Sequence, residues 1–431
     1  MIKVCALLPS LFLFSTSLAF SSSPEAPAKV SAKAPALKKK AAKKVNGFEA
    51  GNFIIKPRFG VFEKFHNNIY TRQNGKKSDA ILVLSPELVV ESDPSAKPNK
   101  IKVNAGLNHN YYGSHNRDTY TDFFTGLNNR YTFDNGGLWD LTGRYRRLHS
   151  ARGDNQTDPT ANAVGPIPYN VVNVDTAFYK RLGDFTVRPH AGFNYFYYEK
   201  VDRLNGGFLT QNQRNHTAYL YGGTIGYDIA KAFQIFTDLE GNTHKYKHDF
   251  ARTGRDSHGG DYILGVQYRP HAKLLAKLGG GYMHRTWSNS QLYKRISTWK
   301  SLARLDWQYH EMSKLRAQMT RSINEVTDRN TSAAVRTDYS LSLNHSLAEK
   351  LFGIVGGRHA RYEYQGGRNA TGGLSDRRDR LYEGMVGLAY KYTNTVTFTT
   401  DYTYTRNKSN ISTSNYNKSV ILVGVKFGFY D

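Results

Sequence analysis

The sequence predicts an all-β protein, namely a transmembrane antiparallel up-and-down β-barrel of about 18 strands, with roughly 16 as the lower limit. Apolar and polar residues alternate with a period of two from Phe53 to the C-terminus. The connections between these segments are alternately short and long. The chain contains 30 Tyr and 23 Phe among 431 residues, yet only 39% of its residues are apolar and its mean hydropathy is -0.58. That apolar fraction is low for a soluble core of this size.

Single segments show the alternation directly. In IKVNAGLNHNYY, Ile101, Val103 and Leu107 alternate with Lys102 and Asn104. Successive side chains of a strand point to opposite faces, so one face would contact lipid and the other the lumen. We predict an even number of strands, as in bacterial single-chain barrels. They lie at about residues 53–65, 80–92, 101–112, 119–133, 138–148, 169–181, 185–198, 216–228, 233–247, 261–268, 273–286, 297–309, 314–324, 332–345, 351–364, 381–391, 396–406 and 416–430.

The connections indicate which end of the barrel faces which compartment. Starting from the first strand, the odd-numbered connections are long and polar, such as HSARGDNQTDPTANAVGPIP, and most even-numbered ones are tight turns, such as LGD, IAKA and RPHA. Outer-membrane barrels have short periplasmic turns and long extracellular loops. An even number of strands returns the C-terminus to the periplasm, where the N-terminal segment also lies.

Soluble all-β folds are the main structural alternative. A propeller or a sandwich also has alternating strands, but it must cover its apolar faces with protein. The aromatic faces here are numerous, and the segment from residue 53 onward contains no convincing helix to cover them. In a barrel the bilayer covers these faces, and closure of the sheet removes its edges.

Residues 1–19 have the composition of a secretory signal peptide. Lys3 supplies the positive start, residues 4–14 form the apolar run, and the small-x-small pattern at 17–19 predicts cleavage before Phe20. The alternative, a membrane anchor, is disfavoured because the apolar run is shorter than the roughly 20 residues that span a bilayer.

Residues 20–52 are predicted to be a disordered periplasmic linker rich in Ala, Lys and Pro, and residues 53–431 to be the barrel. The linker has too few large apolar side chains to offset the entropy of ordering. Its lysine clusters are either a solvated tail or a contact for an anionic polymer or lipid surface. The only cysteine, Cys5, lies in the signal peptide, so the mature chain would have no disulfide and no thiolate metal site.

The C-terminal segment, NYNKSVILVGVKFGFYD, has one apolar face that ends in aromatic residues. In a closed barrel its free edge must pair with the first strand. We predict that Val423, Val425, Phe427 and Phe429 face lipid and form the signal read by the barrel-assembly machinery, and that Asp431 is a periplasmic overhang.

Several motifs resemble a known family. They are the first strand KPRFGVFEKFHNNIY with the following SDAILVLSPELVVES, the central ARTGRDSHGGDYILGVQY with GGGYMHRTW, and the closing DYTYTRNKSNISTSNYNKSVILVGVKFGF. From about Phe53 to Phe429 the chain resembles the bacterial outer-membrane porins of the beta-barrel porin 2 family. This resemblance implies a porin-like barrel of Gram-negative bacteria, and some such barrels are associated with exopolysaccharide secretion.

The charge of the predicted barrel points to the contents of its lumen. The chain has a net charge of +24, and most of it belongs to the segment after the linker. A Lys or Arg that faces lipid at the bilayer midplane costs about 2–4 kcal/mol, so cations within the membrane should face the lumen, where they favour anions. The candidate lumen-lining residues are Lys56, Arg58, Lys102, Arg130, Arg144, Arg146, Lys277, Lys300, Arg304 and Arg316.

Two functions remain open from the sequence. The first is an outer-membrane channel with a basic lumen that passes anionic solutes or serves as a conduit for polysaccharide secretion. The second is a barrel with a structural, lipid-binding or rim enzymatic role and no open pore. In that case inward arginines would pair with acidic residues to fill the interior, and loop cations would hold phosphates of the outer leaflet. Those loop cations are Arg72, Lys76, Lys77, Arg152, Arg255, Arg377, Arg378 and Arg380.

Other classes of function have little support. The sequence contains no His-x-x-x-His motif on a helix, no cysteine pair and no Gly-rich phosphate loop, so we expect no catalytic residue, cofactor or metal site. A nucleic-acid partner is not expected, because the aromatic residues lie on the apolar phase, away from the cations. The expected partners are outer-membrane lipid and lipopolysaccharide, the barrel-assembly machinery and a periplasmic polysaccharide-export protein.

Overall fold

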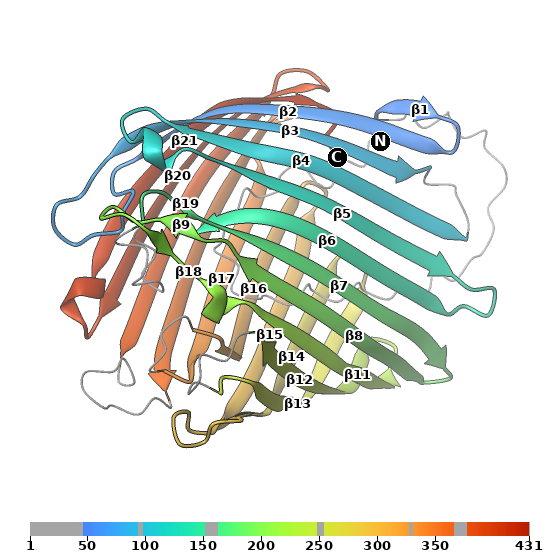
Figure 1. The fold of residues 1–431 in the computed structure, drawn as a ribbon. Helices are drawn as coiled ribbons and strands as arrows, with labels where there is room; N and C mark the ends of the chain where they lie inside the picture. Colours follow the sequence, from blue (N-terminus) through green and yellow to red (C-terminus); the bar gives the residue numbers. More distant parts are fainter. Residues whose placement is uncertain are drawn as a thin grey trace.

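The computed structural model describes residues 46–93, 98–150, 163–247, 254–326, 331–365 and 377–430. The predicted signal peptide and residues 20–45 of the predicted linker lie outside the described residues. The chain forms a sheet of 19 strands, of which β1 (Phe48–Ala50) is a short edge piece, so that 18 long strands make the barrel (Figure 1). The predicted fold class is confirmed.

The strands that form the barrel wall are consecutive along the chain and antiparallel. Their bounds are β2 (Phe53–His66), β3 (Asp79–Ser92), β4 (Asn99–Tyr112), β5 (Tyr120–Thr132), β6 (Leu138–Ser150), β7 (Ile167–Leu182), β8 (Phe185–Tyr198), β11 (His216–Ala230), β12 (Phe233–Tyr246), β13 (Ser257–His271), β14 (Leu274–Trp287), β15 (Ile296–His310), β16 (Ser313–Asn324), β17 (Ala333–Ser346), β18 (Leu351–Gln365), β19 (Arg378–Lys391), β20 (Val396–Ser409) and β21 (Tyr416–Gly428).

Every predicted strand corresponds to one of these elements. The largest difference in length is at β13, which extends from Ser257 to His271, whereas the sequence predicted 261–268. The pairing of β13 with β12 continues through Gly259 and Gly260, which have no side chains to show alternation. The short strand β1 lies within residues 20–52, the segment predicted as a linker.

The barrel is closed by its first and last long strands. β2 pairs with β21 from Arg58 opposite Gly428 to His66 opposite Val420. The two ends of the described chain meet there, since Asn46 donates a hydrogen bond from Nδ2 to the carbonyl of Tyr430 at 2.9 Å. This closure is the pairing that the C-terminal segment predicted.

The two ends of the barrel differ in their connections. At one end, called the short-turn end, two-residue turns join β7 to β8, β11 to β12, β13 to β14 and β15 to β16. Gly183 in the first of these turns has a φ of 60°, a conformation that glycine adopts without strain. At the other end, called the long-loop end, the connection from β8 to β11 includes β9 (Val201–Asp202), β10 (Phe208–Leu209) and the short 3-10 helix η3 (Asn212–Arg214).

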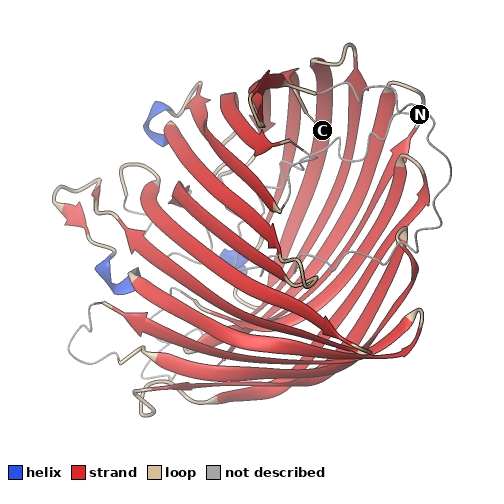
Figure 2. Ribbon diagram, turned by 90° about the vertical axis from the view of Figure 1, so that its right-hand side faces the viewer, coloured by secondary structure: helices blue, strands red, loops and turns tan. Residues whose placement is uncertain are grey.

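Two further 3-10 helices, η1 (Asn116–Asp118) and η5 (Ser412–Ser414), also lie at the long-loop end. No helix among the described residues is long and apolar enough to cross a membrane. Figure 2, turned by 90° from Figure 1, shows the strands running around the wall of the barrel.

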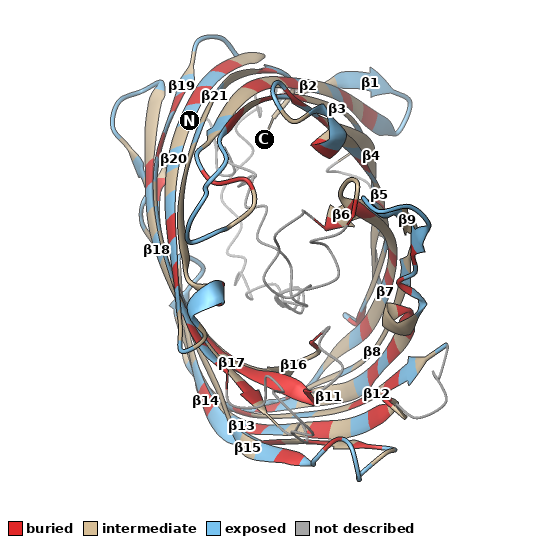
Figure 3. Ribbon diagram, turned by 60° about the vertical axis from the view of Figure 1, so that its left-hand side comes forward, coloured by how far each residue is buried: buried red, intermediate tan, exposed pale blue. Residues whose placement is uncertain are grey.

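The wall has an apolar outer face and a polar inner face. Exposed and less exposed residues alternate along the strands (Figure 3). On β19 and β20, for example, Val386, Leu388, Tyr402 and Phe398 are exposed large side chains in one phase. Residues that are opposite in register share a face, so this phase can be followed around the sheet from strand to strand.

One part of the wall is doubled. β15 and β16 pair only from the short-turn end as far as Leu302 opposite Thr320, and their remaining residues toward the long-loop end diverge. At the point of divergence the Arg321 guanidinium lies 4.3 Å from the centre of the Trp299 ring and donates to Thr337 at 2.6 Å. β16 continues to pair with β17 as far as Asn324 opposite Ala334.

The diverging end of β16 and β17, called the inner hairpin (described residues 321–326 and 331–335), covers the inner face of its neighbours. Its side chains Ala333 and Val335, together with Ile323, pack in a buried cluster with residues of β14 and β15 and of the connection between them. These are Met283, Trp287, Tyr293 and Ile296. The barrel therefore has a second protein layer at this place instead of a single wall.

Candidate functional site

The predicted lumen-lining cations all lie in the inward phase of their strands. On β2, Lys56 and Arg58 alternate with the exposed Phe53 and Phe59. On β14 and β15, Lys277 is opposite Arg304, and both alternate with exposed apolar residues such as Leu278. The register places the remaining predicted cations on the same face, namely Lys102, Arg130, Arg144, Arg146, Lys300 and Arg316.

Most of these cations contact an acidic or polar side chain of the inner wall. Arg58 lies 3.2 Å from Glu87, Arg130 lies 2.6 Å from Asp140, and Lys300 forms an ion pair with Asp261. Arg146 donates to Asn173 at 2.9 Å, and the Lys277 ammonium lies 4.0 Å from the centre of the Phe236 ring. Arg144 is opposite Asn173 in register.

Several acidic residues of the inner wall are each shared by two or more cations. Glu91 contacts Lys56 at 2.6 Å and Lys102 at 3.6 Å. Asp306 pairs with both Arg304 and Arg316. Each such group has one carboxylate and at least two cations, so it carries a net positive charge even though the carboxylate is paired.

A second group of this kind was not among the predicted residues. Asp338 of β17 accepts hydrogen bonds from Arg336 of the same strand and from Arg358 of β18, the latter at 2.7 Å. Both arginines have less than a fifth of their side chains exposed. The alternation in VRTDYSL places Arg336 and Asp338 on one face, so the sequence contained the signal that could have identified them.

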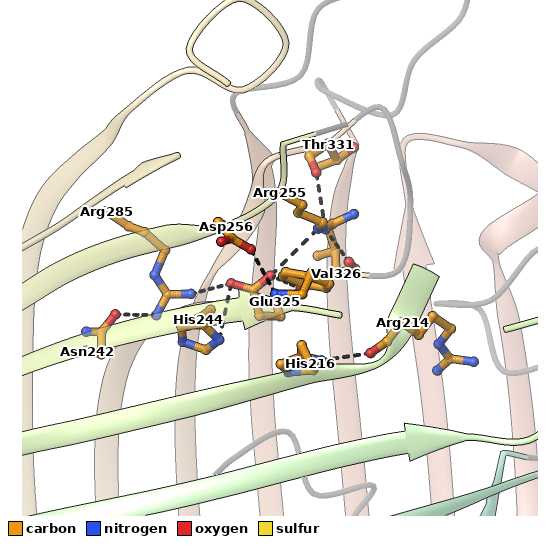
Figure 4. Close-up of polar contacts among 11 residues, drawn as sticks. Arg214, His216, Asn242, His244, Arg255, Asp256, Arg285, Glu325, Val326 and Thr331 are labelled. Atoms are coloured by element: carbon orange, nitrogen blue, oxygen red, sulfur yellow. Dashed lines mark hydrogen bonds and ion pairs between the residues drawn. The ribbon is translucent and has the colours of Figure 1, made fainter. Parts of the chain in front are cut away.

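The tip of the inner hairpin is held by a buried ionic cluster, called the Glu325 cluster (Figure 4). The Glu325 carboxylate accepts hydrogen bonds from Arg285 of β14 at 2.6 Å and from the Tyr246 hydroxyl of β12 at 2.8 Å. Arg255, just before β13, lies 3.8 Å from the same carboxylate, and His244 of β12 lies 4.0 Å from it. One carboxylate thus connects the hairpin to three elements that are not its neighbours in the sheet.

The backbone of the hairpin tip contributes to the same cluster. Arg255 donates hydrogen bonds to the carbonyls of Val326 and Thr331, on the two sides of the hairpin connection. Arg285 also donates to Asn242 of β12 at 3.1 Å, which fixes its guanidinium against the wall. The hairpin is therefore attached to the inner wall through both side-chain and backbone contacts.

The electrostatics of the Glu325 cluster keep its carboxylate ionised. Burial alone would raise the pKa of Glu325, but His244 when protonated and the permanently charged Arg285 and Arg255 lower this pKa from 4.5 to about 2. Burial lowers the pKa of His244 itself to about 3, so at neutral pH the two guanidinium groups supply the positive charge. Glu325 has 13% of its side chain exposed, and Arg285 and Arg255 have 8% and 9%. A buried carboxylate with this many charged partners is strongly coupled to them, so that its loss leaves two guanidinium groups without a counter-charge.

Sequence reasoning missed the Glu325 cluster. Arg255 was considered only as a loop cation, and Glu325 and Arg285 were not considered as a pair. These residues come from connections and strand ends that are far apart in the sequence. No spacing rule brings them together before the inward course of the hairpin is known.

The predicted assembly-signal residues lie at the closing strand. Val423, Val425 and Phe427 lie on β21 in the outward phase, and Val423 and Phe427 are 48% and 43% exposed. Phe429 follows the end of β21, and its ring packs edge-on against that of Phe48 with the centroids 5.1 Å apart. Recognition by the assembly machinery remains a prediction.

The described residues contain no group of three His, Cys, Asp or Glu side chains arranged to hold a metal ion. A closed barrel with an apolar outer face and a polar inner face is the architecture of a porin-like outer-membrane protein. Over residues 42–429 the chain matches the family described as Putative beta-barrel porin 2, and the chain belongs to this family. No curated protein matches the chain significantly.

Solved structures with a similar fold are outer-membrane proteins. The outer membrane protein OpdK from Pseudomonas aeruginosa is 10% identical, with a TM-score of 0.43, over 87% of this chain and 98% of that chain. OccK2 (OpdF) from Pseudomonas aeruginosa is 9% identical, with a TM-score of 0.45, over 88% and 98%. The FrpB iron transporter from Neisseria meningitidis is 10% identical, with a TM-score of 0.42, over 82% and 62%. At these levels the likeness concerns the type of fold and carries no argument about substrate.

Proposed function

We propose that the protein is an outer-membrane channel whose basic lumen favours the passage of anionic solutes. The observation that carries this proposal is the sharing of single acidic residues by several cations on the inner wall, as at Glu91, Asp306 and Asp338. Such groups are partly paired, yet their net charge is positive, and a lumen bounded by low-dielectric walls focuses that potential on solutes.

The orientation of the barrel is part of this proposal. The long-loop end faces the cell exterior, and the short-turn end, where Asn46 meets Tyr430, faces the periplasm. The basic N-terminal segment would then lie in the periplasm, where a polysaccharide-export protein could contact it. Labelling of single-cysteine variants in whole cells tests this orientation. A cysteine in the β8–β11 connection should react with an impermeant reagent, and one that replaces Asp184 in the β7–β8 turn should not.

A secretion conduit is the second candidate function. Its support is the size of the barrel, since 16–18-stranded porins leave an aqueous channel wide enough for hydrated solutes. Acidic polysaccharide carries the same charge as small organic anions and would be attracted by the same inner wall.

Swelling of liposomes that contain the purified full chain separates the candidates. We expect swelling in anionic solutes of low mass, slower swelling in neutral solutes of equal size, and slowest swelling in cationic ones. Entry of small solutes with no uptake of an acidic oligosaccharide would favour the solute channel over the conduit. Equal permeation by anions and cations would refute the role of the basic lumen, and no permeation of any solute would refute the channel itself.

A further inference from the structure

Five cations stand at the long-loop end of the outer face of β18, β19 and β20. They are Arg361, Arg378, Arg380, Arg406 and Lys408, and all of them are exposed. Each lies in the same phase as the exposed aromatic and aliphatic residues of its strand, such as Tyr382 and Val386 on β19. These cations, called the rim patch, therefore point away from the lumen, just beyond the apolar band.

The register of the strands sets like charges directly against one another. Arg361 is opposite Arg380, and Arg380 is opposite Lys408, so three cations form one row across three strands. Cross-strand pairs of like charge destabilise a sheet. The only acidic residue in contact with the rim patch, among those that the structure describes, is Glu363, which pairs with Arg361 and with Arg321. Arg378 lies opposite Glu363 in register. Arg380, Arg406 and Lys408 form no ion pair with another residue that the structure describes, so the patch is suited to an external anion.

An aromatic layer borders the rim patch on the side of the membrane. Tyr339 of β17, His359 of β18 and Tyr382 of β19 are stacked in sequence, with centroid distances of 6.0 and 4.6 Å. Tyr382 is opposite Arg406 in register, and it is two positions after Arg380 on the same face of β19. Aromatic side chains of this kind mark the boundary between headgroups and hydrocarbon in outer-membrane barrels.

Below the aromatic layer the outer face is hollowed. Gly357 and Gly384 are opposite each other, two residues from His359 and Tyr382 toward the short-turn end. They line a depression of about 850 Å³ together with Leu341, Tyr404 and other outward residues of β13 to β20. A Cβ built on Gly384 would meet no atom within 4 Å, so the space beside this glycine is open.

We propose that this surface binds a phosphorylated glycolipid of the outer leaflet, with its phosphate on the rim patch and an acyl chain in the depression at Gly357 and Gly384. The ligand must be amphipathic, because the cations and the apolar depression adjoin on one face and are separated only by the aromatic layer. Phosphate is favoured over carboxylate because it can accept hydrogen bonds from several cations at once, and arginine binds it in bidentate geometry. The proposal rests on the proposed orientation, in which the long-loop end is extracellular.

The rim patch differs from other outward cations near the same end of the barrel. Arg147 of β6 pairs with Glu199 at 3.1 Å, and Lys245 of β12 pairs with Asp256 at 3.0 Å. These cations already have an acidic partner within the protein. They provide matched controls, because they have similar exposure and a similar place on their strands without the excess of positive charge.

The experiment uses the full chain extracted from outer membranes in a mild detergent, with bound lipid measured by native mass spectrometry. Arg380→Gln combined with Lys408→Gln removes two charges from the central row, and Gly384→Leu fills the depression without removing charge. We expect the charge variant and Gly384→Leu each to retain about one tenth of the phosphorylated glycolipid that the wild type retains, because each loses one half of the proposed contact. The control Arg147→Gln should retain the wild-type amount.

Unchanged lipid retention in both the charge variant and Gly384→Leu would overturn the proposal. Retention of diacyl phospholipid in place of the glycolipid would also overturn it, since that lipid belongs to the other leaflet. A stable lipid-free dimer that the charge variant dissociates would overturn it as well, since a second copy of the chain would then occupy the surface. The same variants recorded in planar bilayers separate this proposal from the channel function. Conductance should be unaffected by loss of the lipid, whereas a wild type without conductance would refute the channel alone.

Discussion

Replacement of Glu325 by Gln tests whether the Glu325 cluster holds the inner hairpin against the wall. The change preserves the size of the side chain and removes its charge, so that Arg285 at 2.6 Å and Arg255 at 3.8 Å lose their counter-charge. Breaking a buried pair by removing one partner costs about 3–5 kcal/mol. The lower end of this range applies because the Gln oxygen can still accept a hydrogen bond.

The consequence should be local. The substitution does not alter the buried cluster of Met283, Trp287 and Val335. It also leaves in place the pairing of β16 with β17 and of β17 with β18. A cost of about 3 kcal/mol raises the population of the released hairpin by about a hundredfold, since 1.4 kcal/mol is a factor of ten. The barrel itself, closed by β2 and β21, should remain folded.

Hydrogen-deuterium exchange of the barrel in detergent measures this release directly. We expect amides of residues 321–326 and 331–335 to exchange about a hundredfold faster in Glu325→Gln than in the wild type, with no change in β2 to β8. Glu91→Gln is the matched control, because Glu91 on β3 also pairs with two cations, Lys56 and Lys102, and β3 does not pair with β16 or β17. Exchange of the inner hairpin at the wild-type rate in Glu325→Gln would refute the role assigned to the cluster.

Four further predictions concern other parts of the molecule. Met283 is fully buried, so Met283→Ala leaves a cavity beneath the inner hairpin at a cost of about 2–5 kcal/mol. This variant should also accelerate hydrogen exchange of the inner hairpin, and exchange at the wild-type rate would show that the packing is dispensable. The pKa of Glu325 is lowered in the folded protein to about 2, so its stabilising contribution is present above about pH 4.5 and is lost as the pH falls toward 2; a loss of Glu325-dependent protection between pH 8 and 6 would contradict this sign. Arg316→Glu changes the charge beside Asp306 by two units, which raises the electrostatic energy of a permeating anion by roughly 1 kcal/mol. The preference for anions, measured from the reversal potential, should therefore fall about fivefold. An unchanged reversal potential would place the conducting path elsewhere. Phe429→Asp should block assembly, whereas deletion of Asp431 should be harmless; heat-modifiable barrel from the first variant would disprove the role of the terminal aromatic residue.

The sequence was sufficient to predict the fold because a barrel repeats one local rule. Side chains such as Tyr382, Val386 and Leu388 face lipid, and Glu383 and Met385 in the other phase face inward, in a strand whose alternation is evident without any knowledge of its neighbours. The alternation of short and long connections then orders the strands. Closure follows from the need of β2 and β21 to pair their free edges.

The inner hairpin could not be predicted by the same rule. Val335 and Ile323 alternate with polar residues as lipid-facing side chains do, yet they pack against Met283 and Ile296 of a second protein layer. A period of two shows that a face is apolar and does not show whether lipid or protein covers it. The partners of Glu325 were hidden for the same reason, because Tyr246, Arg255 and Arg285 meet it only when the hairpin turns inward.

The rim patch was partly visible in the sequence. The sequence predicts Arg378 and Arg380 as loop cations, which in one of the two open alternatives hold phosphates, whereas both lie within β19. The register that sets Arg380 opposite Arg361 and Lys408 depends on the lengths of the intervening connections, which the sequence predicts only to within a few residues. Arg255 and Arg377 of the same group are buried against Glu325 and Asp379, and are therefore structural.

The central claim is that the barrel conducts and that its inner wall prefers anions. The most direct measurement is the reversal potential of single channels formed by the purified full chain in a planar bilayer, under a tenfold gradient of potassium chloride. We expect discrete conductance steps and a reversal potential whose sign corresponds to chloride as the more permeant ion. A cation-selective reversal potential would contradict the basic lumen, and the absence of conductance steps would contradict the channel.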